Sequence, residues 1–211
     1  GVMNWVMLSL ILGNTFSNAA PVLMAGLGGM MSEKSGVINI GLEGMMTIGA
    51  LVGAVVGYYI GNPWLAFLCG GLAGAFFGLI HAIVSVSLGG DQTISGIAIN
   101  TLAPGLALFL SRLFFDGTTQ TPSIELENKI PRLFNGFSSQ VVKNLFGQYA
   151  TVYIALIMVL VLYLFLYKTK WGLRVIAVGE HPKAAVTLNI TVKKTRYWSV
   201  VFSGFMAGLG G

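Results

Sequence analysis

The sequence predicts an all-α, polytopic transmembrane helix bundle with broken or re-entrant helices. Of its 211 residues, 55% are hydrophobic and only 9% are charged, whereas about 25% are charged in a typical soluble domain. Apolar runs long enough to cross a bilayer follow one another, separated by short polar breaks. No run alternates apolar and polar residues in the way a membrane β-barrel requires. The expected solvent is therefore lipid.

Twenty-nine glycines support the same class. In a bilayer, small residues let helix backbones approach closely, and this packing replaces the hydrophobic drive between helices. The single cysteine, Cys69, excludes an internal disulfide and a cysteine-rich metal site. A tightly packed bundle is the consequence.

Five spans and the beginning of a sixth are expected. They cover residues 2–31, 36–60, 64–88, 94–115 and 149–167, and the sixth begins near Trp198. The first has weak points at residues 13–15 and 18–21, which predict a broken or re-entrant part. The last residues, GFMAGLGG, stop inside an apolar segment, so residues 1–211 are expected to form one transmembrane domain truncated at its C-terminus.

Basic residues predict the orientation. Seven of the twelve Lys and Arg residues lie between Lys168 and Tyr197, and short loops rich in Lys and Arg face the cytoplasm. Residues 168–197 are therefore expected inside and residues 116–149 outside. The net charge of +5 is explained by topology, and no basic face for nucleic acid is visible.

Polar residues within the spans are candidates for a substrate pathway. Asn39 and Glu43 are four residues apart, on one face of an expected helix, and Asn100 lies in the fourth span. An acidic side chain in a span needs a partner, a proton or water. Lining a pathway and tying helices together both remain open for these residues. His81 is expected to be a satisfied helix contact, and Asp91 a helix cap.

The sequence carries no motif for chemistry. The phosphate-binding loop GxxxxGK[ST], the HExxH and GxSxG motifs, and zinc-ligand spacings are all missing from it. A membrane enzyme would need convergent catalytic groups, and only scattered single residues occur. We expect no cofactor, no metal and no enzymatic activity in this chain.

The stretch AVGEHPKAAVTLNI, residues 177–190, predicts a short helix in the basic loop. Pro182 suits the first helical position, and Asn189 is a plausible left-handed terminator. Ala184, Ala185 and Leu188 would form a small apolar side suited to a groove on a soluble partner. Periodicity alone favours this docking helix and an ordinary solvated loop equally.

Three stretches resemble a known family. Residues 167–211, beginning YKTKWGLRVIAVGEHPKAAVTLNI, resemble the coupling region and following span of ABC importer permeases of the ribose and branched-chain amino acid type, with the pattern TxxGLRxRAVGENPxAAxxxGI. APVLMAGLGGMMSEKSGVINIGLEGMMTIGA, residues 20–50, is similar to the nucleoside branch of that family. GGDQTISGIAINTLAPGL matches its fourth segment. His181 stands where asparagine is usual.

The resemblance implies an inner-membrane permease that works with partners. These are an ATP-binding subunit that hydrolyses ATP, a second permease subunit, identical or different, and an extracytoplasmic binding protein or lipoprotein. The residues that match the coupling helix, which would sit in a cleft of the ATP-binding subunit, are Gly179, Glu180, His181, Pro182, Lys183, Ala184 and Ala185.

The resemblance also implies a substrate class. Sugar-transporting relatives tend to carry an Asp-Leu-Ser-Val-Gly-like sequence where this chain has NIGLEG, residues 39–44. Nucleosides are therefore expected, with simple sugars such as ribose or galactose as the alternative. A secondary transporter that uses Glu43 or Asp91 as an ion or proton relay is the rival class.

Overall fold

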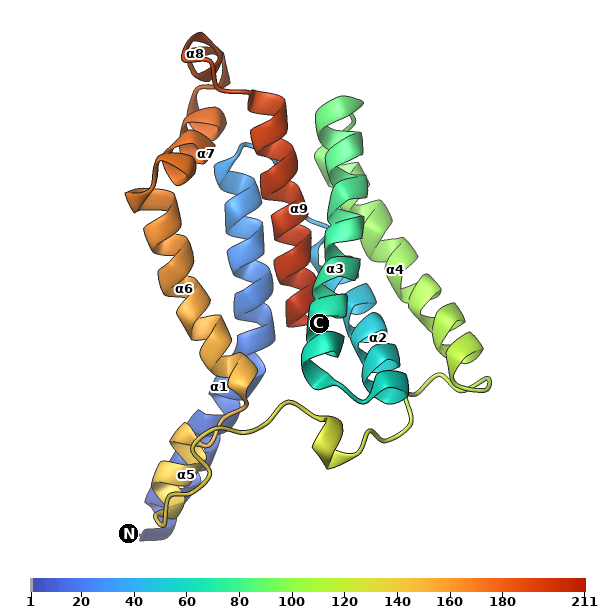
Figure 1. Ribbon diagram of the computed structural model, residues 1–211, viewed down its shortest axis with the longest axis vertical. Helices are drawn as coiled ribbons and strands as arrows, with labels where there is room; N and C mark the ends of the chain where they lie inside the picture. Colours follow the sequence, from blue (N-terminus) through green and yellow to red (C-terminus); the bar gives the residue numbers. More distant parts are fainter. Residues whose placement is uncertain (1) are drawn as a thin grey trace.

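The computed structural model describes residues 2–211 and confirms the all-α class (Figure 1). Its helices are α1 Val2–Lys34, α2 Leu42–Ile60, α3 Pro63–Ala82 with the π-helical turn η1 Ile83–Ser87, α4 Gln92–Phe114, the 3-10 turn η2 Leu126–Asn128, α5 Gln140–Phe146, α6 Ala150–Lys168, α7 Lys170–Glu180, α8 Pro182–Thr187 and α9 Val192–Gly210. Within residues 2–211 the only strand-like pairing is one bridge between Arg132 and Tyr149.

Five helices are long and apolar enough to cross a membrane, as predicted. They are Asn4–Lys34, Leu42–Ile60, Pro63–Ser87, Gln92–Phe114 and Ala150–Lys168. The sixth apolar segment is α9, which begins at Val192 and not near Trp198. Its first residues, VKKTR, are mostly polar. Hydropathy therefore places the start of this helix about a turn and a half too late.

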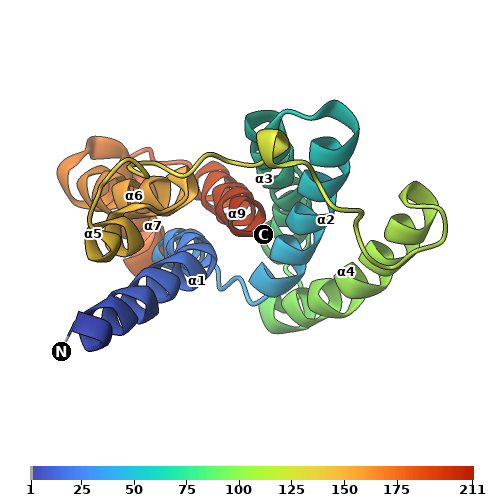
Figure 2. The same cartoon turned by 90° about the horizontal axis from the view of Figure 1, so that it is seen from below.

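The helices form a layered array with α9 at its centre. α9 packs against α1, α2 and α3, while α6 packs on the outer side of α1 and α4 on the outer side of α2. Figure 2 shows this order from α6 on one edge to α4 on the other. The N-terminus lies at the far tip of α1, and the chain ends within the bundle (Figure 1). Two buried clusters hold the array, one among α1, α6 and α9 and one around Met45 and Phe77.

Glycines spaced four apart join α3 to α9. Gly74 of α3 faces the backbone of Gly204 and Gly208, and a Cβ on Gly74 would overlap the Gly204 carbonyl oxygen and lie 2.7 Å from the Gly208 Cα. Gly70 and Gly78 repeat this contact one turn away on each side. Such close approach gives many small dispersion contacts where lipid offers no hydrophobic drive.

The ends of the spans are fixed by local capping. The Asn62 side chain accepts hydrogen bonds from the backbone N–H groups of Trp64 and Leu65, each at 3.1 Å, and so begins α3. Asp91 accepts from the Ile94 N–H at 2.9 Å and begins α4, which confirms its expected capping role.

The expected break in the first span is wrong. α1 is one continuous helix from Val2 to Lys34, with Pro21 inside it. Gly13 marks a close helix contact, because its Cα faces the Asn144 carbonyl of α5. The side chain of Asn144 donates to Ser9 at 3.0 Å, and Ser17 donates to Gln148 at 2.6 Å.

Residues 116–149, for which the sequence predicts an extracytoplasmic loop, contain a short helix. The stretch QVVKNLF forms α5, which packs along the first half of α1 beyond the end of α6 (Figure 1). This end of the molecule is called the α5 end below, and the opposite end, where α8 lies, the α8 end.

Replacing Gly74 by Ala should loosen the α3–α9 contact, because the added methyl group would meet backbone that cannot rotate away. We expect a clear fall in the thermal unfolding midpoint of the purified protein in detergent. Gly105→Ala on α4 is the matched control, since nothing lies within 4 Å of its Cβ position. Equal midpoints for the two variants would contradict the proposed packing.

Candidate functional site

The chain leaves helical geometry between α1 and α2 and runs unwound through the bundle. A Schellman turn ends α1, in which Val37 N–H donates to the Ser32 carbonyl at 3.3 Å and Gly36 N–H to the Glu33 carbonyl at 2.9 Å. Gly36 takes the left-handed conformation this turn requires, with φ of 85°. Residues 37–41, called the unwound segment below, then lead to Leu42 at the start of α2.

Side chains from α3 and α4 satisfy the backbone of the unwound segment. The Ile38 N–H donates to Gln92 at 2.8 Å, and the Ile38 carbonyl lies 3.0 Å from His81 Nε2. A carbonyl only accepts, so this nitrogen of His81 carries hydrogen. Nδ1 of His81 lies 2.9 Å from the Ser95 hydroxyl, and the ring is fully buried. His81 is therefore a satisfied helix contact, as expected.

Asn100 of α4 holds the junction between the unwound segment and α2. Its Oδ1 accepts from the Gly44 N–H at 2.7 Å, and its Nδ2 donates to the Ile40 carbonyl at 2.9 Å. The first N–H groups of a helix have no partner within the helix. Asn100 thus caps α2 from a neighbouring helix and fixes the carbonyl before it.

Asn39 points into the bundle from the unwound segment. It is 6% exposed, donates to the Ser203 hydroxyl of α9 at 2.9 Å and accepts from the Gly41 N–H at 3.1 Å. The expectation that Asn39 and Glu43 share one helical face is wrong, because the helix begins only at Leu42.

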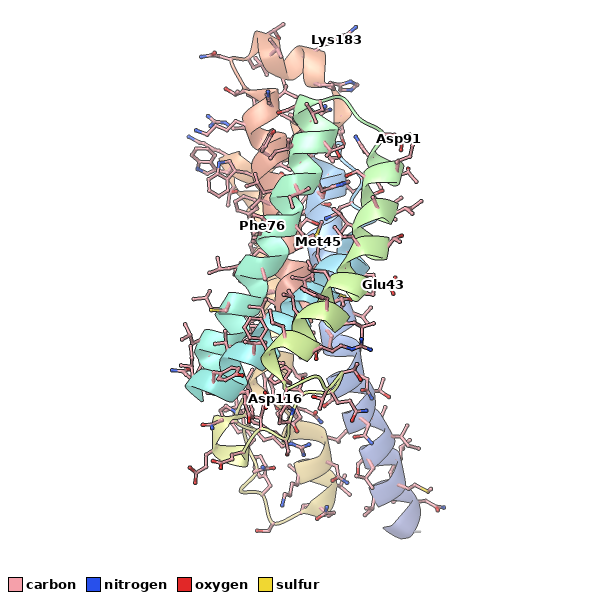
Figure 3. The ribbon with its side chains drawn as sticks, turned by 90° about the vertical axis from the view of Figure 1, so that its right-hand side faces the viewer. Glu43, Met45, Phe76, Asp91, Asp116 and Lys183 are labelled. Atoms are coloured by element: carbon pink, nitrogen blue, oxygen red, sulfur yellow. The ribbon has the colours of Figure 1, made fainter. Side chains whose placement is uncertain are left out.

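Glu43 is exposed at the first turn of α2. Figure 3 shows it at mid-height, between the levels of Asp91 and Asp116. A carboxylate is favoured near the N-terminus of a helix, but at mid-height of a membrane bundle it is costly against lipid. The structure thus brings Asn39, Glu43 and Asn100 around one junction but turns their side chains in different directions.

A cleft of about 440 Å³ lies elsewhere, among α1, α2, α3 and α6 toward the α5 end. Its walls are mostly glycine, alanine and other apolar residues, with a few polar groups such as Ser17 and Lys129. Asn39, Glu43 and Asn100 are not among its lining residues.

The second candidate region is the corner formed by α7 and α8. The sequence reading missed α7, which begins where the Thr169 hydroxyl accepts from the Gly172 N–H at 3.1 Å. Its buried side is only Gly172, Val175 and Val178. The i, i+3, i+6 spacing of these residues after a threonine cap is the sequence pattern that could have predicted α7.

α8 begins at Pro182, as predicted, and ends in a second Schellman turn. Ile190 N–H donates to the Ala185 carbonyl at 3.1 Å and Asn189 N–H to the Val186 carbonyl at 3.0 Å. Asn189 has φ of 59°, which confirms it as the left-handed terminator. Figure 1 shows α8 projecting beyond the other helices.

The predicted apolar side of α8 is partly wrong. Ala185 is 1% exposed, because it faces inward onto the chain, whereas Val186 is 62% and Leu188 73% exposed. The exposed apolar group is therefore Ala184, Val186 and Leu188. Of the other predicted coupling residues, Glu180, His181 and Lys183 are exposed, and Gly179 and Pro182 are half-buried.

The corner rests directly on the turn that precedes the unwound segment. A Cβ on Gly179 would overlap the Lys34 carbonyl oxygen, and one on Gly36 would lie 3.3 Å from the Gly179 Cα. Arg196 of α9 adds a hydrogen bond from Nε to the Ser35 carbonyl at 3.1 Å. Two regions that are far apart in sequence thus touch backbone to backbone.

Replacing Asn100 by Asp should destabilise the fold, although the two side chains have the same shape. Aspartate keeps the acceptor for the Gly44 N–H but sets an oxygen against the Ile40 carbonyl, at a cost of about 1–3 kcal/mol for the orphaned group. The midpoint of thermal unfolding in detergent measures this. Thr101→Val on the next residue is the control, because the Thr101 hydroxyl bonds only to its own helix at Ile97. An unchanged midpoint for Asn100→Asp would contradict a stabilising role for the two hydrogen bonds of Asn100.

The sequence matches a known family and several curated relatives. Residues 11–211 match the family model described as branched-chain amino acid transport system, permease component. The guanosine ABC transporter permease protein NupQ of Bacillus subtilis is 44% identical over 214 residues, which are 97% of this chain and 66% of NupQ. The nucleoside ABC transporter permease protein NupC of Lactococcus lactis is 35% identical over 217 residues, again 97% of this chain and 66% of the relative.

TsgC13 of Haloferax volcanii, named provisionally as a glucose ABC transporter permease, is 39% identical over 204 residues, which are 95% of this chain and 61% of TsgC13. This chain thus spans about two thirds of the length of these relatives. No solved structure matches it. The family match over nearly the whole chain, together with five apolar helices, shows a multi-pass protein of the cytoplasmic membrane that belongs to the family of branched-chain amino acid transport system permease components.

Proposed function

We propose that the chain is the membrane-spanning permease subunit of an ATP-driven importer that moves nucleosides by alternating access. The observation that carries the proposal is α8, a helix of six residues that begins at Pro182, ends in a Schellman turn and lies beyond the bundle. A helix this short is not stable in water without contacts. Its exposed apolar side chains, Val186 and Leu188, suit a groove on a soluble partner.

Charge supports a cytoplasmic position for α8. The α8 end carries Lys34 in addition to the seven basic residues of the segment 168–197. By the bias of short cytoplasmic loops toward Lys and Arg, this end faces the cytoplasm. Residues 116–149, at the α5 end, then face outward, where an external binding protein or lipoprotein delivers solute.

The partner that fits α8 is a separate ATP-binding subunit, which hydrolyses ATP for the complex. Glu180, His181, Lys183 and Ala184, which are exposed, form the contact together with Val186 and Leu188. Gly179 and Ala185 are not part of this contact surface. Gly179 packs on the turn after α1, and Ala185 is buried.

Movement of α8 would reach the middle of the membrane through the Gly179–Gly36 contact. That contact lies directly before the unwound segment. Within this segment, the side chain of Asn39 donates a hydrogen bond to Ser203 on the central helix α9. Two arrangements of this segment, biased by the ATP-binding subunit, would give the inward- and outward-facing states. A second permease subunit, identical or different, would complete the pathway.

Glu43 supports the position of the pathway. An exposed carboxylate at mid-height is costly against lipid, so the surface that carries it faces water or another protein surface. Asn39 and Asn100 lie at the same junction and shape it through hydrogen bonds. These three residues are the proposed lining and support of the substrate pathway.

The relatives favour nucleosides as substrates. NupQ is named as a guanosine permease, and NupC is named as a nucleoside permease. TsgC13, at 39% identity, is named as a glucose permease. The uptake experiment therefore includes glucose as the alternative substrate. A secondary transporter remains the rival mechanism, and its uptake would collapse with an uncoupler and survive loss of ATP.

The proposal is tested with the complete importer in proteoliposomes. We expect uptake of radiolabelled guanosine to require ATP and to survive an uncoupler, with glucose transported less efficiently. Leu188→Ser should reduce ATP-driven guanosine uptake and the stimulation of ATP hydrolysis by substrate. The change removes an exposed apolar contact with the ATP-binding subunit and leaves the core intact. Leu88→Ser is the control, since Leu88 is also 73% exposed but lies at the end of η1. Uptake driven by a proton gradient without ATP would sink the proposal.

Replacing Glu43 by Gln should lower uptake while the complex still assembles, because the amide keeps the size of the side chain and removes its charge. Uptake at saturating ATP and the yield of the purified complex are measured together. Glu125→Gln, in the outer loop, serves as the control. If yield and uptake fall in parallel, Glu43 has a structural role and not a pathway role.

A further inference from the structure

The outward face of α7 combines basic and aromatic side chains, and no other part of residues 2–211 covers it. Lys170, Trp171, Leu173 and Arg174 are exposed, and Trp171 is 68% exposed. The opposite side packs into a buried cluster of Met31, Leu166 and Val175. α7 is therefore held firmly on the bundle from one side while its other side is open.

This face continues the surface that α6 presents to lipid. Exposed apolar side chains follow one another along α6, namely Leu156, Ile157, Leu160, Val161 and Leu164. They give way to Tyr163 and Tyr167, whose ring centroids are 5.4 Å apart. Lys168 and then α7 come next, and Figure 1 shows α7 directly beyond the end of α6 at the edge of the bundle.

The order of side chains along this surface matches the order of chemistry across a lipid leaflet. Aliphatic residues suit the hydrocarbon, tyrosine and tryptophan suit the interface, and Lys and Arg suit the phosphate level. Residues 163–178 contain three basic residues, Lys168, Lys170 and Arg174, and no acidic residue. The surface is thus complementary to an anionic headgroup.

One contact gives the surface a defined geometry. The guanidinium carbon of Arg174 lies 4.9 Å from the centroid of the Trp171 ring. A cation stacked on an aromatic ring is held in place without losing its charge or its N–H donors. Arg174 can therefore keep donating to a phosphate while Trp171 remains at the interface.

We propose that Lys168, Lys170 and Arg174 bind the phosphate of an anionic phospholipid, with Trp171 and Tyr167 at the level of its glycerol region. The occupant is a lipid and not a free anion, because the site is continuous with the lipid-facing surface of α6. This site is independent of the transport proposal, since it uses neither the exposed residues of α8 nor the unwound segment.

The site is tested by fluorescence of the full chain in nanodiscs. Trp171 is kept as the only tryptophan, with Trp5, Trp64 and Trp198 replaced by Phe. Phosphatidylglycerol or phosphatidylcholine brominated near the headgroup is mixed into a phosphatidylcholine disc. We expect brominated phosphatidylglycerol to quench at a lower mole fraction than brominated phosphatidylcholine, by about fivefold for each basic residue that contributes and so by roughly a hundredfold if all three do.

Charge variants separate a specific site from a general attraction. Lys168→Gln, Lys170→Gln and Arg174→Gln together should abolish the preference for phosphatidylglycerol. The control replaces Lys183, Lys193 and Lys194 by Gln, which removes the same charge from the same end and should leave the preference intact. The proposal is overturned if both lipids quench equally, if the two triple variants behave alike, or if inorganic phosphate displaces the lipid. It is also overturned if Trp171 is quenched by aqueous acrylamide but by neither lipid.

Discussion

A stretch of non-helical backbone inside a membrane bundle is the constraint on which this structure depends. In hydrocarbon, every peptide group needs a partner, and helical hydrogen bonds reach only the two ends of the unwound segment, at Val37 and Gly41. His81, Gln92 and Asn100 supply those bonds from α3 and α4, and Asn39 ties the segment to α9. Helices α3, α4 and α9 must therefore keep fixed positions around the unwound segment.

The small residues of the bundle serve the same constraint. α4 approaches the segment closely at Gly96, whose Cβ position lies 2.9 Å from the Gly41 nitrogen, and α9 reaches α3 through facing glycines. Larger side chains at these places would separate the helices and carry the hydrogen-bonding groups out of range. Helix spacing and polar satisfaction are thus a single requirement in this protein.

Hydropathy predicted the spans well because it depends on each residue alone. The corner at α8 was also readable, since proline at the first position and asparagine in the left-handed region have local causes. Facing directions were not readable. Ala185 is buried because of how α8 rests on the bundle. Asn39 lies in non-helical backbone, where side chains of α3 and α4 bond to the flanking residues Ile38 and Ile40. Gly13 was read as a break although it marks a helix contact, since both need the same residue.

The central place of α9 has a consequence for the order of assembly. α9 is the last of the helices within residues 2–211, yet it fills the space between α1 and α3. At about 5–20 residues per second, the ribosome needs on the order of ten seconds to reach α9 after completing α3. During that interval Gly74 and Gly78 of α3 lack the α9 backbone that they face in the completed structure. The part of the nascent bundle formed by residues 2–211 is therefore open along its middle until α9 enters, and insertion of α9 fills the space between α1 and α3.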